Sequence, residues 1–103
     1  MVTIVKEYLE TTFDANNPYQ VREPIYCADG YHISVQGGTE FHYCLPRRHV
    51  NEYECVECGF PTALDEELAE YAETPDTTDT VFGYVPIEVI EQVIAKHGGI
   101  VIT

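Results

Sequence analysis

The sequence predicts an α+β domain in which a mainly antiparallel sheet of about five to six strands carries two helices packed on one face. Three observations lead to this fold class. Short runs of β-branched and aromatic residues, separated by turn residues, occupy the first half of the chain. After Pro61 the apolar residues follow the helical period in two segments. The length of 103 residues leaves room for one modest core, so we expect a single globular domain over residues 1–103.

Strands are predicted mainly before residue 60. Residues 2–13 mix β-branched and apolar side chains without a helical stripe, so we expect a strand there. Further strands are expected at residues 41–45, after a chain reversal at Gly37-Gly38, and at residues 53–58.

A β-hairpin is predicted around the dipeptide Asp29-Gly30. It lies between two runs of apolar residues and can supply the two positive φ angles of a type I′ turn. Such a two-residue loop would place Cys27 opposite His32 and Tyr26 opposite Ile33.

Two helices are predicted in the second half. Thr62 is a good N-cap for the first, whose apolar face consists of Leu64, Leu68, Tyr71 and Ala72. Pro86 opens the second and Gly98 ends it. Its apolar stripe consists of Ile87, Ile90, Val93 and Ile94. Short strands are expected before it, at residues 81–85, and after it, at residues 100–102.

The charge limits the classes of function. The chain has 18 acidic and 5 basic residues and a formal net charge of −13. This charge opposes binding to phosphate backbones and anionic membranes, so we expect no direct nucleic-acid partner and no membrane partner. The N-terminal segment lacks the features of a signal peptide, and no stretch approaches the roughly 18 apolar residues of a membrane span. These features predict a cytoplasmic protein, and no motif indicates a cofactor.

The middle third of the chain has the composition of a binding site. Residues 22–60 contain all four cysteines, three of the four histidines and all three arginines. Arginine provides planar donors for phosphate or carboxylate, and aromatic faces suit a base. The candidate ligand-binding residues are Arg47, Arg48, His42, Tyr43, His32 and Tyr53. In the alternative interpretation, both arginines pair with neighbouring glutamates on the surface.

The four cysteines allow two further interpretations. Cys55 and Cys58 have the spacing of a zinc knuckle, and Cys27 and Cys44 could complete a zinc module. One knuckle is half a site, and free cysteines are commonly buried, so we expect no metal and keep zinc as an alternative. A cysteine nucleophile beside a histidine is conceivable, but no catalytic motif accompanies it. We therefore expect a non-enzymatic protein without catalytic residues.

An acidic segment without any base follows. It contains Asp65, Glu66, Glu67, Glu70, Glu73, Asp76 and Asp79. Such a run is usually a solvated helix face. Alternatively, Asp65, Glu66, Glu67, Glu70 and Glu73 form a surface that imitates nucleic acid and binds another protein.

Four segments resemble small proteins of unknown activity that tailed bacteriophages and prophages encode. They are Ser34-Val35-Gln36, His42-Tyr43-Cys44-x-Pro46-Arg47, Val56-Glu57-x-Gly59-Phe60-Pro61 and Val81-Phe82-Gly83-Tyr84-Val85-Pro86-x-Glu88-Val89-Ile90. The likeness extends over residues 24–99. It implies a phage accessory protein in the cytoplasm of the bacterial host, where such proteins frequently counter host defence. In that family the position of Cys58 is often aliphatic, which argues against an essential four-cysteine metal site.

Two hypotheses of function follow. In the first, the protein sequesters a small anionic, nucleotide-derived ligand at the arginines without catalysis. In the second, the protein is an acidic inhibitor that binds a host protein. If the inhibitor imitates nucleic acid, it binds through the acidic segment. A homo-oligomer is compatible with both.

Overall fold

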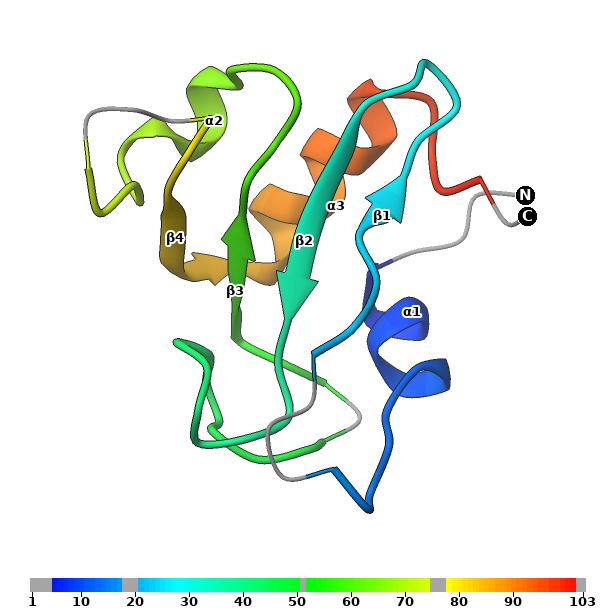
Figure 1. Cartoon of the computed structure of the whole chain (residues 1–103), viewed down its shortest axis with the longest axis vertical. Helices are drawn as coiled ribbons and strands as arrows, with labels where there is room; N and C mark the ends of the chain where they lie inside the picture. The colour runs from blue at the N-terminus through cyan, green and yellow to red at the C-terminus, as the bar shows by residue number, and fades with distance from the viewer. Residues whose placement is uncertain (1–4, 18–20, 51, 75–77, 102–103) are drawn as a thin grey trace.

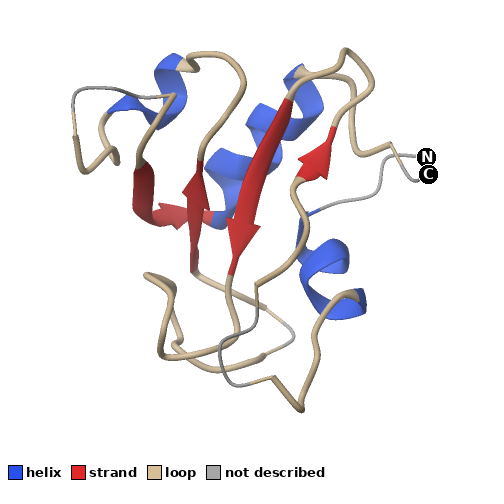
Figure 2. Ribbon diagram, viewed as in Figure 1, coloured by secondary structure: helices blue, strands red, loops and turns tan. Residues whose placement is uncertain are grey.

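The sheet is a meander of four strands. The computed structural model describes residues 5–17, 21–50, 52–74 and 78–101. Within them the strands pair antiparallel in the order β1-β2-β3-β4 (Figures 1 and 2). The strands are β1 (Ile25–Tyr26), β2 (His32–Gln36), β3 (Cys55–Gly59) and β4 (Val81–Pro86), and the helices are α1 (Val5–Thr11), α2 (Glu66–Ala69) and α3 (Ile87–Lys96). The predicted α+β class and antiparallel sheet are confirmed. The predicted strand and helix numbers are wrong, because the described residues form four strands and three helices.

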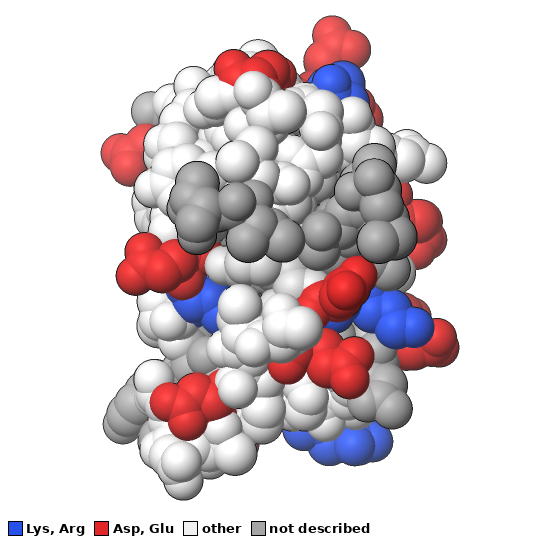
Figure 3. Space-filling view, turned by 90° about the vertical axis from the view of Figure 1, so that its right-hand side faces the viewer, with Lys and Arg blue, Asp and Glu red and all other residues white. Residues whose placement is uncertain are grey.

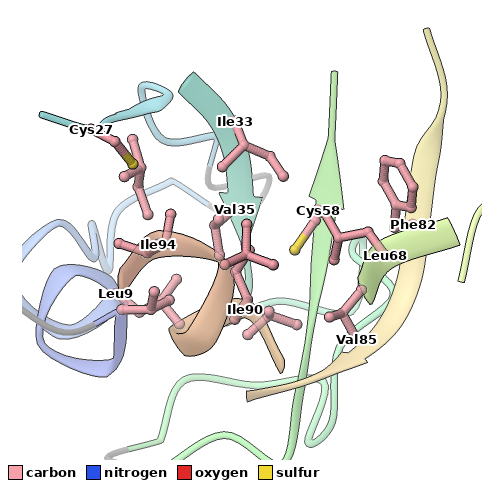
Figure 4. Packing of buried hydrophobic residues seen from close by; sticks show 14 of the residues in the cluster. Leu9, Cys27, Ile33, Val35, Cys58, Leu68, Phe82, Val85, Ile90 and Ile94 are labelled. Atoms are coloured by element: carbon pink, nitrogen blue, oxygen red, sulfur yellow. The ribbon is translucent and has the colours of Figure 1, made fainter. Parts of the chain in front are cut away.

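The hydrophobic core lies between the sheet and α3. This helix lies behind β2 and β3 in Figure 1, and it contacts β4 and both other helices. All seven elements contribute buried residues to one cluster, including Leu9, Ile33, Val35, Val56, Cys58, Leu68, Phe82, Val85, Ile90 and Ile94 (Figure 4). The apolar stripe predicted for α3 is confirmed at Ile90, Val93 and Ile94, whereas Ile87 is only half-buried. Strands β3 and β4 also occur close to their predicted positions.

The opposite face of the sheet carries polar side chains. In β3, Glu57 is half-buried between the core residues Val56 and Cys58. Two residues of β4, Gly83 and Tyr84, lie opposite Glu57 alone, and this arrangement is a β-bulge. Tyr84 has a φ of 52° and is 41% exposed. The bulge therefore turns an aromatic side chain away from the core.

The predicted strand at residues 2–13 is wrong, because residues 5–11 form helix α1. Val5 and Leu9, one turn apart, are fully buried in the core, and α1 contacts α3. Residues 1–4 lie outside the described residues. The apolar face of α1 consists of these two residues, and seven residues are too few for a clear periodic pattern in the sequence.

The hairpin forms with a different register. Ile25 pairs with Ile33 and Tyr26 pairs with His32, one residue away from the predicted register. The loop has three residues, 28–30, because the Cys27 N–H donates to the Tyr31 carbonyl at 2.8 Å. In this loop only Gly30 has a positive φ, of 93°, so the turn is not type I′. The register places the two isoleucines together on the core face.

The predicted strand at residues 41–45 is also wrong. These residues form a loop, and β2 pairs directly with β3. Leu45 alone forms a bridge, with Cys55. Burial does alternate in this segment, but His42 and Cys44 are the buried residues, whereas the apolar residues Phe41, Tyr43 and Leu45 are exposed.

The first predicted helix is shorter than expected. Thr62 is not its N-cap, because its backbone and side chain both bond with the backbone of His32 at 3.0 Å. Helix α2 begins only after Asp65, and Leu64, predicted on its apolar face, is 60% exposed. Of the strand predicted at residues 100–102, Ile100 forms an isolated bridge and Ile102 lies outside the described residues.

Neighbouring segments cover both edges of the sheet. Beyond β1, the Val101 N–H donates to the Tyr26 carbonyl at 2.7 Å. Beyond β4, the N–H groups of Gly83 and Tyr84 donate to the carbonyls of Tyr71 and Tyr43. These edge groups are therefore already used and cannot pair with a strand of a partner. No helix among the described residues is long and apolar enough to cross a membrane.

Candidate ligand-binding site

The loop of residues 39–49, here called the arginine loop, lies over the polar face of the sheet. The carboxylate of Glu57 holds this loop over the sheet. Glu57 Oε1 lies 3.1 Å from His42 Nδ1, and Glu57 Oε2 accepts the Tyr43 N–H at 3.3 Å. The Tyr43 carbonyl in turn accepts the Tyr84 N–H at 3.0 Å. Strands β3 and β4 therefore determine where the loop lies.

Sequence reasoning missed Glu57 as the residue that positions this loop. Its signal in the sequence is an acid between Val56 and Cys58, which alternation places on the face opposite the core. The sequence alone does not indicate the partner of that carboxylate, because His42 is 15 positions away.

Both arginines of the loop are exposed. Arg47 Nη2 donates to the Glu40 carbonyl, which orients its guanidinium along the loop. Neither arginine takes part in the ion pairs of the described residues, where Glu52 pairs with Lys6 and Glu57 with His42. The alternative prediction, that both arginines pair with neighbouring glutamates, is therefore wrong for the described part of the chain.

The structure separates the six predicted ligand-binding residues. Tyr43 is 40% exposed and its ring centroid lies 5.8 Å from that of Tyr84. His42 and Tyr53 are buried, and the Tyr53 hydroxyl lies 3.2 Å from His49 Nδ1. His32 lies against Tyr26 on the polar face of β1 and β2, with ring centroids 5.0 Å apart. The arginine loop thus carries Arg47, Arg48 and Tyr43 as exposed residues, and His42 is its buried attachment.

Exposed apolar side chains accompany the arginines. On the same loop Phe41 is 52% exposed and Leu45 is 39% exposed. Arginine and aromatic residues are the types enriched where proteins bind partners. A loop that carries both exposed apolar groups and guanidinium groups outside any ion pair of the described residues can contact a ligand with an aromatic and an anionic part.

The four cysteines are free and buried. Burial raises the pKa of every thiol, that of Cys27 to about 11, so the reactive thiolate is scarce at neutral pH. Cys58 lies in the core cluster and Cys55 does not, although both belong to β3. The described residues contain no group of three or more side chains placed to hold a metal ion. The burial and raised pKa of the four thiols give no support to a cysteine nucleophile.

A second cluster joins three separate parts of the chain. His97, at the end of α3, has its Nδ1 2.6 Å from Asp29 Oδ2 of the hairpin loop and its Nε2 3.1 Å from Asp65 Oδ1 before α2. Lys96 Nζ lies 2.6 Å from the same Asp65 oxygen, and the Tyr31 ring stacks on His97 with centroids 3.7 Å apart. We call Asp29, Asp65, Lys96 and His97 the histidine clamp. Both ring nitrogens of His97 face carboxylates, so the clamp is suited to holding the fold together.

We expect the clamp to make stability depend on pH. Burial lowers the pKa of His97, but its hydrogen bonds to Asp29 and Asp65 outweigh burial and leave the pKa raised. This stabilisation is complete below the unfolded-state pKa of about 6.5 and is lost as the pH rises through the folded-state value. Urea denaturation at about pH 6 and about pH 8 should therefore give the lower free energy of unfolding at the higher pH.

The variant His97→Gln is the control for this pH dependence. It should remove most of the difference in the free energy of unfolding between the two pH values. An unchanged difference would show that other groups cause it.

The carboxylates of the clamp act at acid pH. Burial raises the pKa of Asp65, but Lys96 and its other hydrogen-bond partners lower it more, and His97 lowers the pKa of Asp29. Their contribution should be lost as the pH falls through these depressed values, below about 3.9.

The predicted acidic surface is divided. Asp65 is buried and bound in the clamp, which contradicts its place on that surface, and Glu67 pairs with Lys96 at 3.0 Å. Glu66, Glu70 and Glu73 are exposed. They take no part in the ion pairs of the described residues. Asp76 lies outside the described residues.

Fold and site together define a small α+β domain with a charged and aromatic loop attached to the polar face of its sheet. No protein-family model, curated protein or solved structure matches the chain.

Proposed function

We propose that the protein is a non-enzymatic binding protein whose arginine loop holds an anionic group of its ligand. One observation carries this proposal: Arg47 and Arg48 are exposed and form no ion pair within the described residues, although the chain has a net charge of −13. Acidic groups are abundant on the surface, as the α1 side of the molecule illustrates (Figure 3). Two arginines left unpaired in such a protein remain available to an external anion.

The chemistry of the loop favours a small nucleotide-derived ligand. A guanidinium group binds phosphate with two parallel hydrogen bonds. Tyr43 is 40% exposed, and an aromatic side chain of this kind can stack on a base. Sequestration of such a ligand needs no catalytic group. The resemblance to phage proteins suggests a setting for it, an accessory protein that counters host defence in the bacterial cytoplasm.

A second candidate function is an acidic inhibitor that binds a host protein. Two observations favour it. Glu66, Glu70 and Glu73 are exposed and form no ion pair in the described part of the chain. Small ligands usually bind in concave sites. Neither Arg47 nor Arg48 lines the cavity beside Lys6 and Glu52 or the cavity beside Asp29 and Thr62. A protein partner could instead contact the exposed surface.

We expect Arg47→Ala to weaken ligand binding roughly ten- to a hundredfold without unfolding the protein, because it removes a charged, bidentate contact. Arg48→Ala should act in the same direction. Purification from phage-infected or defence-expressing bacteria, followed by denaturing mass spectrometry, would identify the small molecules and proteins that each variant retains. A thermal melt would verify that the exposed substitutions leave the fold intact.

The control is a variant in which Glu66, Glu67, Glu70 and Glu73 are all changed to Gln. It should retain the ligand. If this variant loses its partner while both arginine variants keep it, the acidic inhibitor replaces the sequestering protein as the proposed function. A retained nucleotide-derived molecule that depends on Arg47 would support sequestration, and a retained protein that depends on Arg47 would move the site to a protein interface.

A further inference from the structure

A cavity of about 520 Å³ lies between α1, the segment before β3 and the first turns of α3. Lys6 and Glu52 contribute to its wall, and Glu88 and Glu91 contribute from α3. Its volume is within the range of roughly 300–1,000 Å³ that is usual for small-molecule sites. Arg47 and Arg48 do not line it.

Three carboxylates and one ammonium group line this cavity, and two of the carboxylates are already engaged. Glu52 pairs with Lys6 at 2.9 Å, but the Glu52 side chain is 79% exposed, so this pair is weak and can open. Glu91 accepts the backbone N–H of Val5. The Glu88 side chain forms no hydrogen bond or ion pair with any other described residue. Its carboxylate is therefore available to a ligand.

The position of Glu88 and Glu91 on α3 favours a cation between them. Residues three apart on a helix are neighbours on its surface, so Glu88 and Glu91 lie on one side of α3. Burial also raises the pKa of Glu91 in spite of its bond to Val5, which indicates that the negative form is poorly compensated. A positive group between the two carboxylates would compensate the charge of Glu91 and contact the carboxylate of Glu88.

The remaining wall of the cavity is not acidic. Ile87 offers an apolar surface, and Tyr53 and Gln92 complete the lining. An alkyl chain can pack on Ile87 while its positive end lies beside the carboxylates. The lining therefore suits a molecule with an apolar body and a positive end, rather than a bare metal ion.

We propose that this cavity binds a small organic cation, an ammonium or guanidinium group on a short alkyl chain, with the positive group between Glu88 and Glu91. This site is independent of the arginine loop, and its failure would leave the proposed function untouched.

Isothermal titration calorimetry of the full chain with agmatine, which carries both kinds of positive group, tests the proposal. We expect saturable binding of one molecule at physiological salt, and we expect Glu88→Gln to weaken it about tenfold. Glu70→Gln is the matched control, because Glu70 is an exposed acid outside the cavity. It should change the affinity less than about twofold, as expected for a solvent-screened charge that does not line the cavity.

Amide NMR spectra recorded during the same titration would locate the ligand. Shifts concentrated at Lys6, Glu88 and Glu91 would support the site. Equal losses of affinity in the two variants would overturn it, because binding would then follow the overall charge of the protein. The absence of saturable binding at millimolar agmatine would also overturn it.

Discussion

Ile90→Ala should lower the free energy of unfolding by about 2–5 kcal/mol. Ile90 is fully buried in the core between α3 and the sheet, among the side chains of Val35 and Val85 (Figure 4). The substitution removes apolar contacts and leaves a cavity that close-packed neighbours fill only in part. Urea denaturation monitored by circular dichroism measures the loss.

Ile87→Ala is the matched control, because it makes the same chemical change on the same helix. Ile87 is only half-buried, so less apolar surface is lost. Its effect should be clearly smaller than that of Ile90→Ala. A loss below about 1 kcal/mol at Ile90, or a larger loss at Ile87, would mean that α3 presents a different face to the sheet.

Arg22→Met should destabilise the protein by about 2–4 kcal/mol, although it replaces a charged residue by an apolar one of similar length. Arg22 is only 5% exposed, and its guanidinium donates to the carbonyls of Leu9 and Gly37 at 2.8 and 2.5 Å and to Thr12 Oγ1 at 2.8 Å. Leu9 lies in the last turn of α1, where carbonyls lack partners within the helix. Methionine would leave these acceptors without a donor.

Two further variants test this explanation. Arg22→Lys keeps the positive charge but cannot reach three acceptors with the geometry of a guanidinium, so an intermediate loss is expected. Arg48→Ala removes an exposed arginine and should change the free energy of unfolding by less than about 0.5 kcal/mol. If Arg22→Lys were as stable as the natural chain, charge rather than the three directed hydrogen bonds would explain the role of Arg22.

The elements with a clear local pattern were predictable from the sequence. Helix α3 has an apolar stripe over ten residues, a proline at its start and a glycine after its end, and it forms close to where these signals place it. Strands β3 and β4 follow from β-branched and aromatic residues between turn residues. Each of these signals lies within the element that it specifies.

Segments stabilised by distant residues were not predictable. Helix α1 depends on packing against α3 and on Arg22, which is 13 positions away from Leu9. The arginine loop looks like a strand, but Glu57 holds it over the sheet through a side-chain contact. Apolar alternation predicts that side chains point to two sides, and it does not say whether a backbone pairs with another strand.

The sequence by itself determined the excess of acidic groups, the α+β class and the arginine pair as the basic group of the middle third. The tertiary structure alone decided which charges are used internally. It buries Asp65 in a clamp with His97, pairs His42 with Glu57, and leaves Arg47 and Arg48 unpaired within the described residues. The physical reason is that ion pairs form between groups brought within a few ångströms of each other, and these partners lie 15 to 32 positions apart in the sequence.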